Sequence, residues 1–224
     1  MINVVCLLAG DKYKPIYVQN LYNMVKRHLT VPHKFICFTD HVKLHKLVEG
    51  DIEIRPLIHN DLQGWFNKMS FFSPQAKLEG VNLYFDLDVV ILKNIDCFAE
   101  FGSVGSFCIL NDFGQPDQCN SSIMKFNNET ATGLIWDHYY KDKNRFRKLH
   151  GDQNIIYELT MNKPYHARFP NEWTQSYKWY SRKKPRFHKT EWTFELDPMT
   201  KVAVFHGQPN PHESDKQWVK ENWK

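Results

Sequence analysis

Several features that would place the protein in a membrane or an oxidising compartment are missing from the sequence. No apolar run reaches the roughly 18 residues that a membrane-spanning helix needs. The chain starts on an apolar segment, without the basic stretch and small-residue cleavage site of a secretory signal. Its five cysteines, with Cys6, Cys37 and Cys108 inside apolar runs, form no CxxC motif and no Cys/His ligand spacing. We therefore expect a soluble cytoplasmic protein with reduced thiols, for which peripheral membrane contact stays open.

A large excess of charge of one sign is also missing. With 29 Lys and Arg against 25 Asp and Glu, the formal net charge is only +4. Nucleic-acid binding usually needs a denser basic stripe, so we expect no specific nucleic-acid partner, whereas a small anionic substrate fits this balance. The sequence also lacks GxGxxG, which argues against a Rossmann dinucleotide cofactor.

Short apolar runs alternate with helical patterns along the chain, which is typical of an α/β fold with a mainly parallel central sheet flanked by helices. We predict strands over residues 2–8, 34–39, 52–57, 81–86, 104–110, 121–126 and 201–205. We predict helices over residues 18–29, 64–72, 129–141 and 152–160, and a loop over the aromatic and basic residues 170–198. No repeat or linker divides the chain, so residues 1–224 predict a single domain.

Polar or glycine residues follow four of the predicted strands. These segments are Gly10-Asp11, Thr39-Asp40, Asp86-Leu87-Asp88 and His206-Gly207. Ligands of open parallel sheets bind beyond the carboxyl ends of the strands. We therefore expect the four segments to contribute to one shared site.

Asp86 and Asp88 are two carboxylates in an otherwise apolar stretch. In extended backbone, residues i and i+2 project to the same side, so the two carboxylates should lie close together. Close negative charges in a half-buried setting repel each other unless a cation neutralises them, and Mg²⁺ or Mn²⁺ prefers such oxygen ligands. The pattern therefore predicts a divalent-metal site, with a pair of turn-forming or helix-capping aspartates as the alternative.

Five segments, in the same order along the chain, resemble GT-A glycosyltransferases of the glycogenin-like family 8 and small bacterial and viral DxD glycosyltransferases. They are GWFNK at 64–68, LYFDLDVVI at 83–91, NSSIM at 120–124, GDQ at 151–153 and VFHGQPNP at 204–211. The order of the matches across residues 2 to about 213 is more specific than any one motif.

The resemblance implies a single GT-A, or nucleotide-diphospho-sugar transferase, domain, with the nucleotide-binding half over about 1–95 and the acceptor and sugar half over about 96–224. It implies metal-dependent transfer of a sugar from a nucleotide-sugar, a UDP-sugar rather than a GDP-sugar, to an acceptor hydroxyl of a glycan. Family 8 enzymes retain the anomeric configuration. If the reaction inverts instead, Asp152 or Asp112 would be the candidate bases.

The resemblance also implies roles for individual residues. Asp86, Asp88 and His206 would bind Mn²⁺ or Mg²⁺. Lys68, Asp152 and Gln153 would be the catalytic residues, with Lys68 neutralising the diphosphate and Asp152 holding the sugar hydroxyls. The implied donor-binding residues are Ala9, Gly10, Asp11, Tyr13, Asp40, Lys68, Asp86, Leu87, Asp88, Asn120, Ser121, Lys178 and Gly207.

Two positions depart from the family pattern. Asn210 stands where many relatives have a lysine, which shifts phosphate neutralisation to Lys68 or Lys178, and Ser122 replaces a glycine. Some assignments also have ordinary structural alternatives: Asp40 and Asp152 could cap helices, and Lys68 could be a solvated helix lysine.

Two other functional classes stay open. Phosphohydrolases of the haloacid-dehalogenase type also use strand-D-x-D, but there the motif normally ends the first strand of the domain. A non-catalytic sugar-binding or nucleic-acid-binding module would explain Trp173, Tyr177, Trp179, Tyr180 and the basic residues 182–186. The same aromatic and basic region could instead be an acceptor-binding lid.

Overall fold

The computed structural model describes residues 1–178 and 196–224. Trp179, Tyr180 and the basic residues 182–186 lie outside the described residues, and so does most of the region considered as an acceptor lid. Among the residues that the structure describes, no helix combines the length and hydrophobicity that crossing a bilayer requires.

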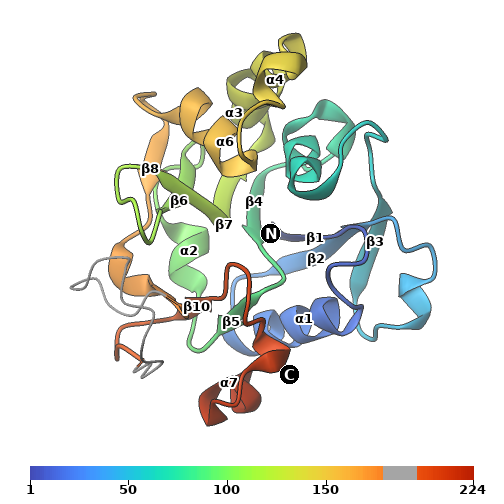
Figure 1. The fold of residues 1–224 in the computed structure, drawn as a ribbon, viewed down its shortest axis with the longest axis vertical. Helices are drawn as coiled ribbons and strands as arrows, with labels where there is room; N and C mark the ends of the chain where they lie inside the picture. The colour runs from blue at the N-terminus through green and yellow to red at the C-terminus, as the bar shows by residue number, and fades with distance from the viewer. Residues whose placement is uncertain (179–195) are drawn as a thin grey trace.

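A seven-stranded mixed sheet forms the centre of the protein (Figure 1). Its strands are β1 (Ile2–Leu8), β2 (His33–Thr39), β3 (Ile52–Pro56), β4 (Val81–Phe85), β6 (Phe107–Asn111), β7 (Cys119–Asn127) and β8 (His166–Arg168). They are ordered β3-β2-β1-β4-β7-β6-β8, and β7 runs antiparallel to both β4 and β6 while the other neighbours are parallel. The predicted α/β fold with a mainly parallel sheet is confirmed.

A second, three-stranded sheet brings the end of the chain to the acidic segment. In it β10 (Val202–Val204) pairs antiparallel with β5 (Val89–Ile91) and parallel with β9 (Thr174–Ser176). The amide of Phe205 donates to the carbonyl of Asp88 at 3.0 Å. The pairing therefore places His206 and Gly207 directly beside Asp88.

Helices cover both faces of the central sheet (Figure 1). The α-helices are α1 (Ile16–His28), α2 (Asp96–Glu100), α3 (Asn128–Ala131), α4 (Asp137–Lys141), α5 (Lys143–Phe146), α6 (Asp152–Thr160) and α7 (Gln217–Asn222). The remaining helical segments are the 3₁₀ helices Leu44–Lys46, Gly64–Phe72, Pro74–Ala76, Asn171–Trp173 and Pro211–Glu213, and the π-helical turn Thr132–Trp136.

The alternation of side chains along β1 explains the two cores. Val4, Cys6 and Leu8 are buried on the face covered by α1, β5 and β10, whereas Val5 is buried on the face covered by α6 and the 3₁₀ helix Gly64–Phe72. Buried residues of α1 recur at spacings of three and four, as an amphipathic helix requires. Both cores leave the carboxyl ends of β1 and β4 open to a pocket.

Several predicted boundaries were wrong. The strand predicted over residues 104–110 begins only at Phe107, and the helix predicted over 129–141 is divided by the π-helical turn Thr132–Trp136. The predicted helix over 64–72 is present but has 3₁₀ geometry. The prediction also missed β5, β8 and β9, because strands of three residues are too short to show a period.

Candidate active site

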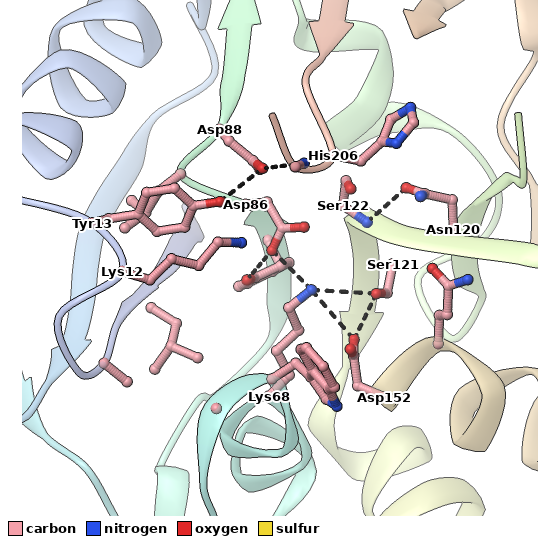
Figure 2. Close-up of a pocket in the computed structure, with 18 residues that line it drawn as sticks. Lys12, Tyr13, Lys68, Asp86, Asp88, Asn120, Ser121, Ser122, Asp152 and His206 are labelled. Atoms are coloured by element: carbon pink, nitrogen blue, oxygen red, sulfur yellow. Dashed lines mark hydrogen bonds and ion pairs between the residues drawn. The ribbon is translucent and has the colours of Figure 1, made fainter. Parts of the chain in front are cut away.

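The carboxyl ends of β1 and β4 meet at a pocket of about 410 Å³ (Figure 2). Its wall combines carboxylates, lysines and aromatic rings. The lining residues are Leu7, Ala9, Lys12, Tyr13, Gly64, Trp65, Lys68, Tyr84, Asp86, Leu87, Asp88, Asn120, Ser121, Ser122, Asp152, Gln153, His206 and Gly207. A pocket at this edge of the sheet is where open α/β folds bind their ligands.

The acidic pair lies in a turn between β4 and β5 and not in extended backbone. The amide of Asp86 donates to the carbonyl of Ser122 at 2.8 Å, which ties the start of the turn to β7. Both aspartates line the pocket, so they share one cavity although the predicted strand geometry was wrong. Leu87 between them packs into the core on the α1 face.

Asp86 belongs to a buried charged network with Lys68, Ser121 and Asp152 (Figure 2). The Lys68 ammonium lies 2.8 Å from Oδ1 of Asp86, 3.3 Å from Oδ2 of Asp152 and 3.3 Å from Oγ of Ser121. Ser121 in turn donates to Asp152 at 2.6 Å. The side chain of Asp152 thus serves this network, although the residue is the first of α6.

The charges of Lys68 and Asp86 stabilise each other's ionised form. Burial alone would lower the pKa of Lys68, which is only 7% exposed, but Asp152 and Asp86 outweigh it and raise that pKa. Burial would likewise raise the pKa of Asp86, yet Lys68 and the hydroxyl of Tyr84, at 2.6 Å, leave it below the ordinary value. Lys68 is therefore a buried cation and not a solvated helix lysine.

Asp88 has a different environment from that of Asp86. It is 4% exposed, it accepts a hydrogen bond of 2.8 Å from the Tyr13 hydroxyl, and its Oδ2 lies 3.5 Å from the amide nitrogen of Gly207. Burial and the charge of Asp86 raise the pKa of Asp88, while Tyr13, Lys12 and Lys68 oppose that shift. Part of the charge repulsion at Asp88 is thus left for a cation to relieve.

His206 comes close to the acidic pair through its backbone, whereas its ring points away from Asp88 (Figure 2). The ring stacks on Phe113, with centroids 5.5 Å apart, and its Nε2 lies 2.6 Å from Oγ of Ser176. Burial and the charge of Lys178 lower the pKa of His206 to about 4. The imidazole is therefore neutral at pH 7, which is the form that a metal ligand requires.

The residues around the pocket fit a divalent cation in part. Asp86 and Asp88 supply carboxylate oxygens, which are the ligands that Mg²⁺ and Mn²⁺ prefer. No three His, Cys, Asp or Glu residues of the described ranges are grouped closely enough to hold a metal. An Asp86–Asp88–His206 ligand set would need a new rotamer of His206.

Two lysines flank Asp88 from different elements. Lys12, which follows β1 and lines the pocket, lies with its ammonium 4.5 Å from the ring centroid of Tyr13. Lys178, just after β9, donates to the carbonyl of His206 at 3.0 Å. Burial and the charge of Lys12 lower the pKa of Lys178. The sequence analysis identified Lys178 but missed Lys12, whose position directly before Tyr13 was the only available signal.

Gly207 has a backbone conformation that favours glycine. Its φ is +97°, and a Cβ built there would lie 2.8 Å from Nζ of Lys178. Glycine therefore allows the Lys178 ammonium to approach the turn beside Asp88.

The structure separates some residues that the sequence analysis assigned to one site. Gly10, Asp11 and Asp40 line a second, more open cavity of about 450 Å³ together with His41, Val42, Lys43, Leu44 and Leu47. Asp40 accepts hydrogen bonds of 3.0 and 3.2 Å from the amide of Gly10. Its side chain therefore stabilises the turn after β1 and does not cap a helix. Asp112 accepts from the amides of Gly114 and Gln115 and is not among the pocket residues.

The segment around Asn120 lines the pocket beside the acidic turn. Asn120 and Ser122 are buried in β7, where the side-chain oxygen of Asn120 accepts from the amide of Ser122 at 3.0 Å. Ser122 has a negative φ, so serine fits the backbone at this position without strain. Gln153 lines the pocket one residue after Asp152, and Trp65 stands at its edge with 54% of its surface exposed.

The sequence matches no protein-family model and no curated protein. The structure is similar to solved glycosyltransferases. The glycosyltransferase GlyE of Streptococcus pneumoniae TIGR4 has a TM-score of 0.67 at 17% identity, over 94% of this chain and 56% of GlyE, so this chain spans little more than half of that protein. An active-site mutant of LgtC gives 0.69 at 11% identity, over 98% of this chain and 93% of LgtC.

A third solved structure, mouse xyloside xylosyltransferase 1 in its apo form, gives a TM-score of 0.58 at 11% identity, over 92% of this chain and 97% of that protein. These structural matches cover 92% to 98% of this chain, and they agree with the GT-A fold that the sequence motifs predicted. This chain therefore has the fold of the GT-A glycosyltransferases.

Proposed function

We propose that the protein is a metal-dependent glycosyltransferase that moves a sugar from a nucleoside-diphosphate sugar to a hydroxyl group of a glycan or another acceptor. The observation that carries this proposal is the pair of carboxylates at the open edge of a GT-A sheet, the half-buried Asp86 and the buried Asp88. The likeness to GlyE and LgtC supports glycosyl transfer as the reaction class.

Asp86 and Asp88 would hold Mn²⁺ or Mg²⁺, which when bound would neutralise the diphosphate of the donor. The raised pKa of Asp88 supports this assignment, because burial beside Asp86 leaves negative charge that a divalent cation would stabilise. His206 would complete the ligand set only after its ring leaves Ser176 and Phe113.

Lys68, Ser121 and Asp152 would form the sugar end of the pocket. Their hydrogen bonds fix the Asp152 carboxylate at the surface of the cavity, where it would accept hydrogen bonds from sugar hydroxyls. Lys68 would hold that carboxylate in place through their ion pair and would put positive charge near the departing diphosphate. Gln153, next in α6, would lie near the anomeric carbon.

Tyr13 and Ala9 would contact the nucleoside, and the neighbouring cavity of Gly10, Asp11 and Asp40 would receive the base. The resemblance to family 8 favours a UDP-sugar over a GDP-sugar. LgtC has been crystallised in a complex with donor and acceptor sugar analogues, which supports a site that holds both substrates.

The experiment is a thermal-shift panel of UDP, GDP, ADP and CDP with and without Mn²⁺, followed by the corresponding UDP-sugars. We expect at least one nucleoside diphosphate to raise the melting temperature only with Mn²⁺, and we expect Asp88→Asn to abolish that rise. A matched control is Asp96→Asn. Asp96 is the first residue of α2, its carboxylate accepts a hydrogen bond from the amide of Thr30, and it is not among the pocket residues.

No shift with any nucleotide, or a shift that is insensitive to both Mn²⁺ and Asp88→Asn, would contradict the proposal. Release of phosphate from simple phosphomonoesters would favour a phosphohydrolase instead, although the GT-A fold is not the haloacid-dehalogenase fold.

A further inference from the structure

We propose that Lys12 and Lys178 form a two-lysine anion site that binds the donor's diphosphate directly, so that part of the nucleotide affinity persists without a divalent cation. This inference rests on the proposed glycosyltransferase function and assigns its substrate contacts further. Lys12 is new to the site, and neither lysine needs the metal in order to attract phosphate.

The first lysine, Lys12, has its ammonium inside the pocket. Figure 2 shows the side chain reaching past Tyr13 with its nitrogen directed toward the acidic turn. The ammonium lies 4.5 Å from the Tyr13 ring centroid, so a cation–π contact holds it there. Among the described residues, no carboxylate lies within 4.0 Å of this ammonium, although its charge does act on Asp88.

The second lysine, Lys178, comes from a different part of the chain, just after β9, and does not itself line the pocket. Its ammonium donates to the carbonyl of His206 and lies against Gly207, which itself lines the pocket. Within the described part of the chain it also has no carboxylate within 4.0 Å. Its hydrogen bond goes to a neutral backbone carbonyl, so no direct ion pair among the described residues neutralises its charge.

The two ammonium groups repel each other in the free protein. The charge of Lys12 acts unfavourably on Lys178, while the carboxylates of Asp88 and Glu213 act favourably on it. A diphosphate carries several negative charges and many acceptor oxygens, and it would relieve the repulsion by accepting from both lysines. Sugar hydroxyls and nucleobases are neutral and would not relieve this repulsion. The two lysines therefore favour a phosphate-bearing ligand.

The alternative is that Lys12 only neutralises Asp88. That role would make Lys12 important for the stability of the free protein but irrelevant to nucleotide binding once the metal is removed. The two roles therefore differ in a measurable way.

The test is calorimetric titration in EDTA of UDP and of uridine, with UDP replaced by whichever nucleoside diphosphate binds best in Mn²⁺. We expect the wild-type protein to prefer the diphosphate by about tenfold or more, and we expect Lys12→Met and Lys178→Met each to remove most of that preference. Lys12→Arg should retain it. Binding of uridine should be unchanged in every variant.

The matched controls lose the same charge nearby. The first control is Lys14→Met, because Lys14 is exposed, lies two positions from Lys12 and is not among the pocket residues. Lys201→Met removes a partly buried lysine that, like Lys178, donates to a backbone carbonyl, in its case that of Asn94 at 3.2 Å. Both controls should bind the diphosphate like the wild type.

Equal diphosphate affinity in the wild type and both lysine variants would overturn the inference, and so would the absence of any diphosphate preference in EDTA. In either case the proposed function would stand if Mn²⁺-dependent binding is intact. If the wild type binds no nucleoside diphosphate even in Mn²⁺, the proposed function itself fails.

Discussion

The hydroxyl of Tyr13 donates a hydrogen bond of 2.8 Å to Oδ2 of Asp88, although the two residues lie 75 positions apart in the sequence. The bond joins the turn after β1 to the turn after β4, and it is one of the interactions that oppose the raised pKa of Asp88. Tyr13 therefore stabilises the ionised carboxylate that the proposed metal site needs.

Replacing Tyr13 with phenylalanine should destabilise the metal-free protein at pH 7 by about 1.5–3 kcal/mol, the usual contribution of a hydrogen bond to a charged group. The reason is that the Asp88 carboxylate stays buried beside Asp86 with one donor fewer. Urea denaturation of wild type, Tyr13→Phe, Asp88→Asn and the double variant forms a cycle that isolates this bond. If Tyr13→Phe costs as much in the Asp88→Asn variant as in the wild type, the two side chains are not coupled.

Lys68→Met should destabilise the protein by about 3–5 kcal/mol, because it leaves the buried Asp152 and the half-buried Asp86 without their shared cation. Adding Asp152→Asn should restore part of that loss, since the second change removes one of the uncompensated charges. Denaturation of the single and double variants measures both effects. Lys26→Met, on the exposed side of α1, is the control and should stay within about 0.5 kcal/mol of wild type. A double variant no more stable than Lys68→Met would disprove the coupling.

The sequence was sufficient for the fold and for the position of the acidic turn. The apolar run 2–8 and the three-to-four spacing in α1 are local patterns, and they define β1 and its covering helix within a few residues. Asp86, Asp88, Lys68 and Asp152 were each assigned to a site, and the structure places all four around one pocket.

Long-range packing accounts for what the sequence analysis missed. The ring of His206 is held by Ser176 on β9 and Phe113 after β6, contacts that depend on the three-stranded sheet. Since that sheet consists of strands of three residues, its pairing has no signal in the hydrophobic pattern. The separation of Asp40 from the main pocket likewise follows from its hydrogen bond to Gly10, which sequence spacing cannot specify.

Stability should fall as the pH is lowered from 7.5 to 5, in part because of His206. Its pKa is about 4 in the folded protein against 6.5 ordinarily, so only the unfolded chain takes up a proton between those values. The stabilising contribution of neutral His206 is complete above pH 6.5 and is lost progressively as the pH falls toward 4. The loss amounts to about 2 kcal/mol at pH 5. Denaturation of His206→Gln at both pH values should show a correspondingly smaller loss. Part of the pH dependence should remain in this variant, because it still contains His166, whose pKa is similarly lowered to about 4. A loss of stability as large as that of the wild type would contradict the prediction.

Gly207→Ala should disturb both the backbone and the anion site. At a φ of +97° any side chain is strained, by about 1–2 kcal/mol, and the new methyl group would also meet the Lys178 ammonium. We therefore expect lower stability in urea denaturation together with weaker binding of the nucleoside diphosphate in EDTA. Adding Lys178→Met should reduce the stability cost of the alanine, because the steric conflict disappears while the backbone strain persists.

Gly133→Ala is the matched control. A Cβ built at Gly133 has no atom within 4 Å, and the residue lies in a helical segment, so the change should be neutral or stabilising. If the Gly207 and Lys178 changes prove additive, the ammonium does not lie against this glycine in solution.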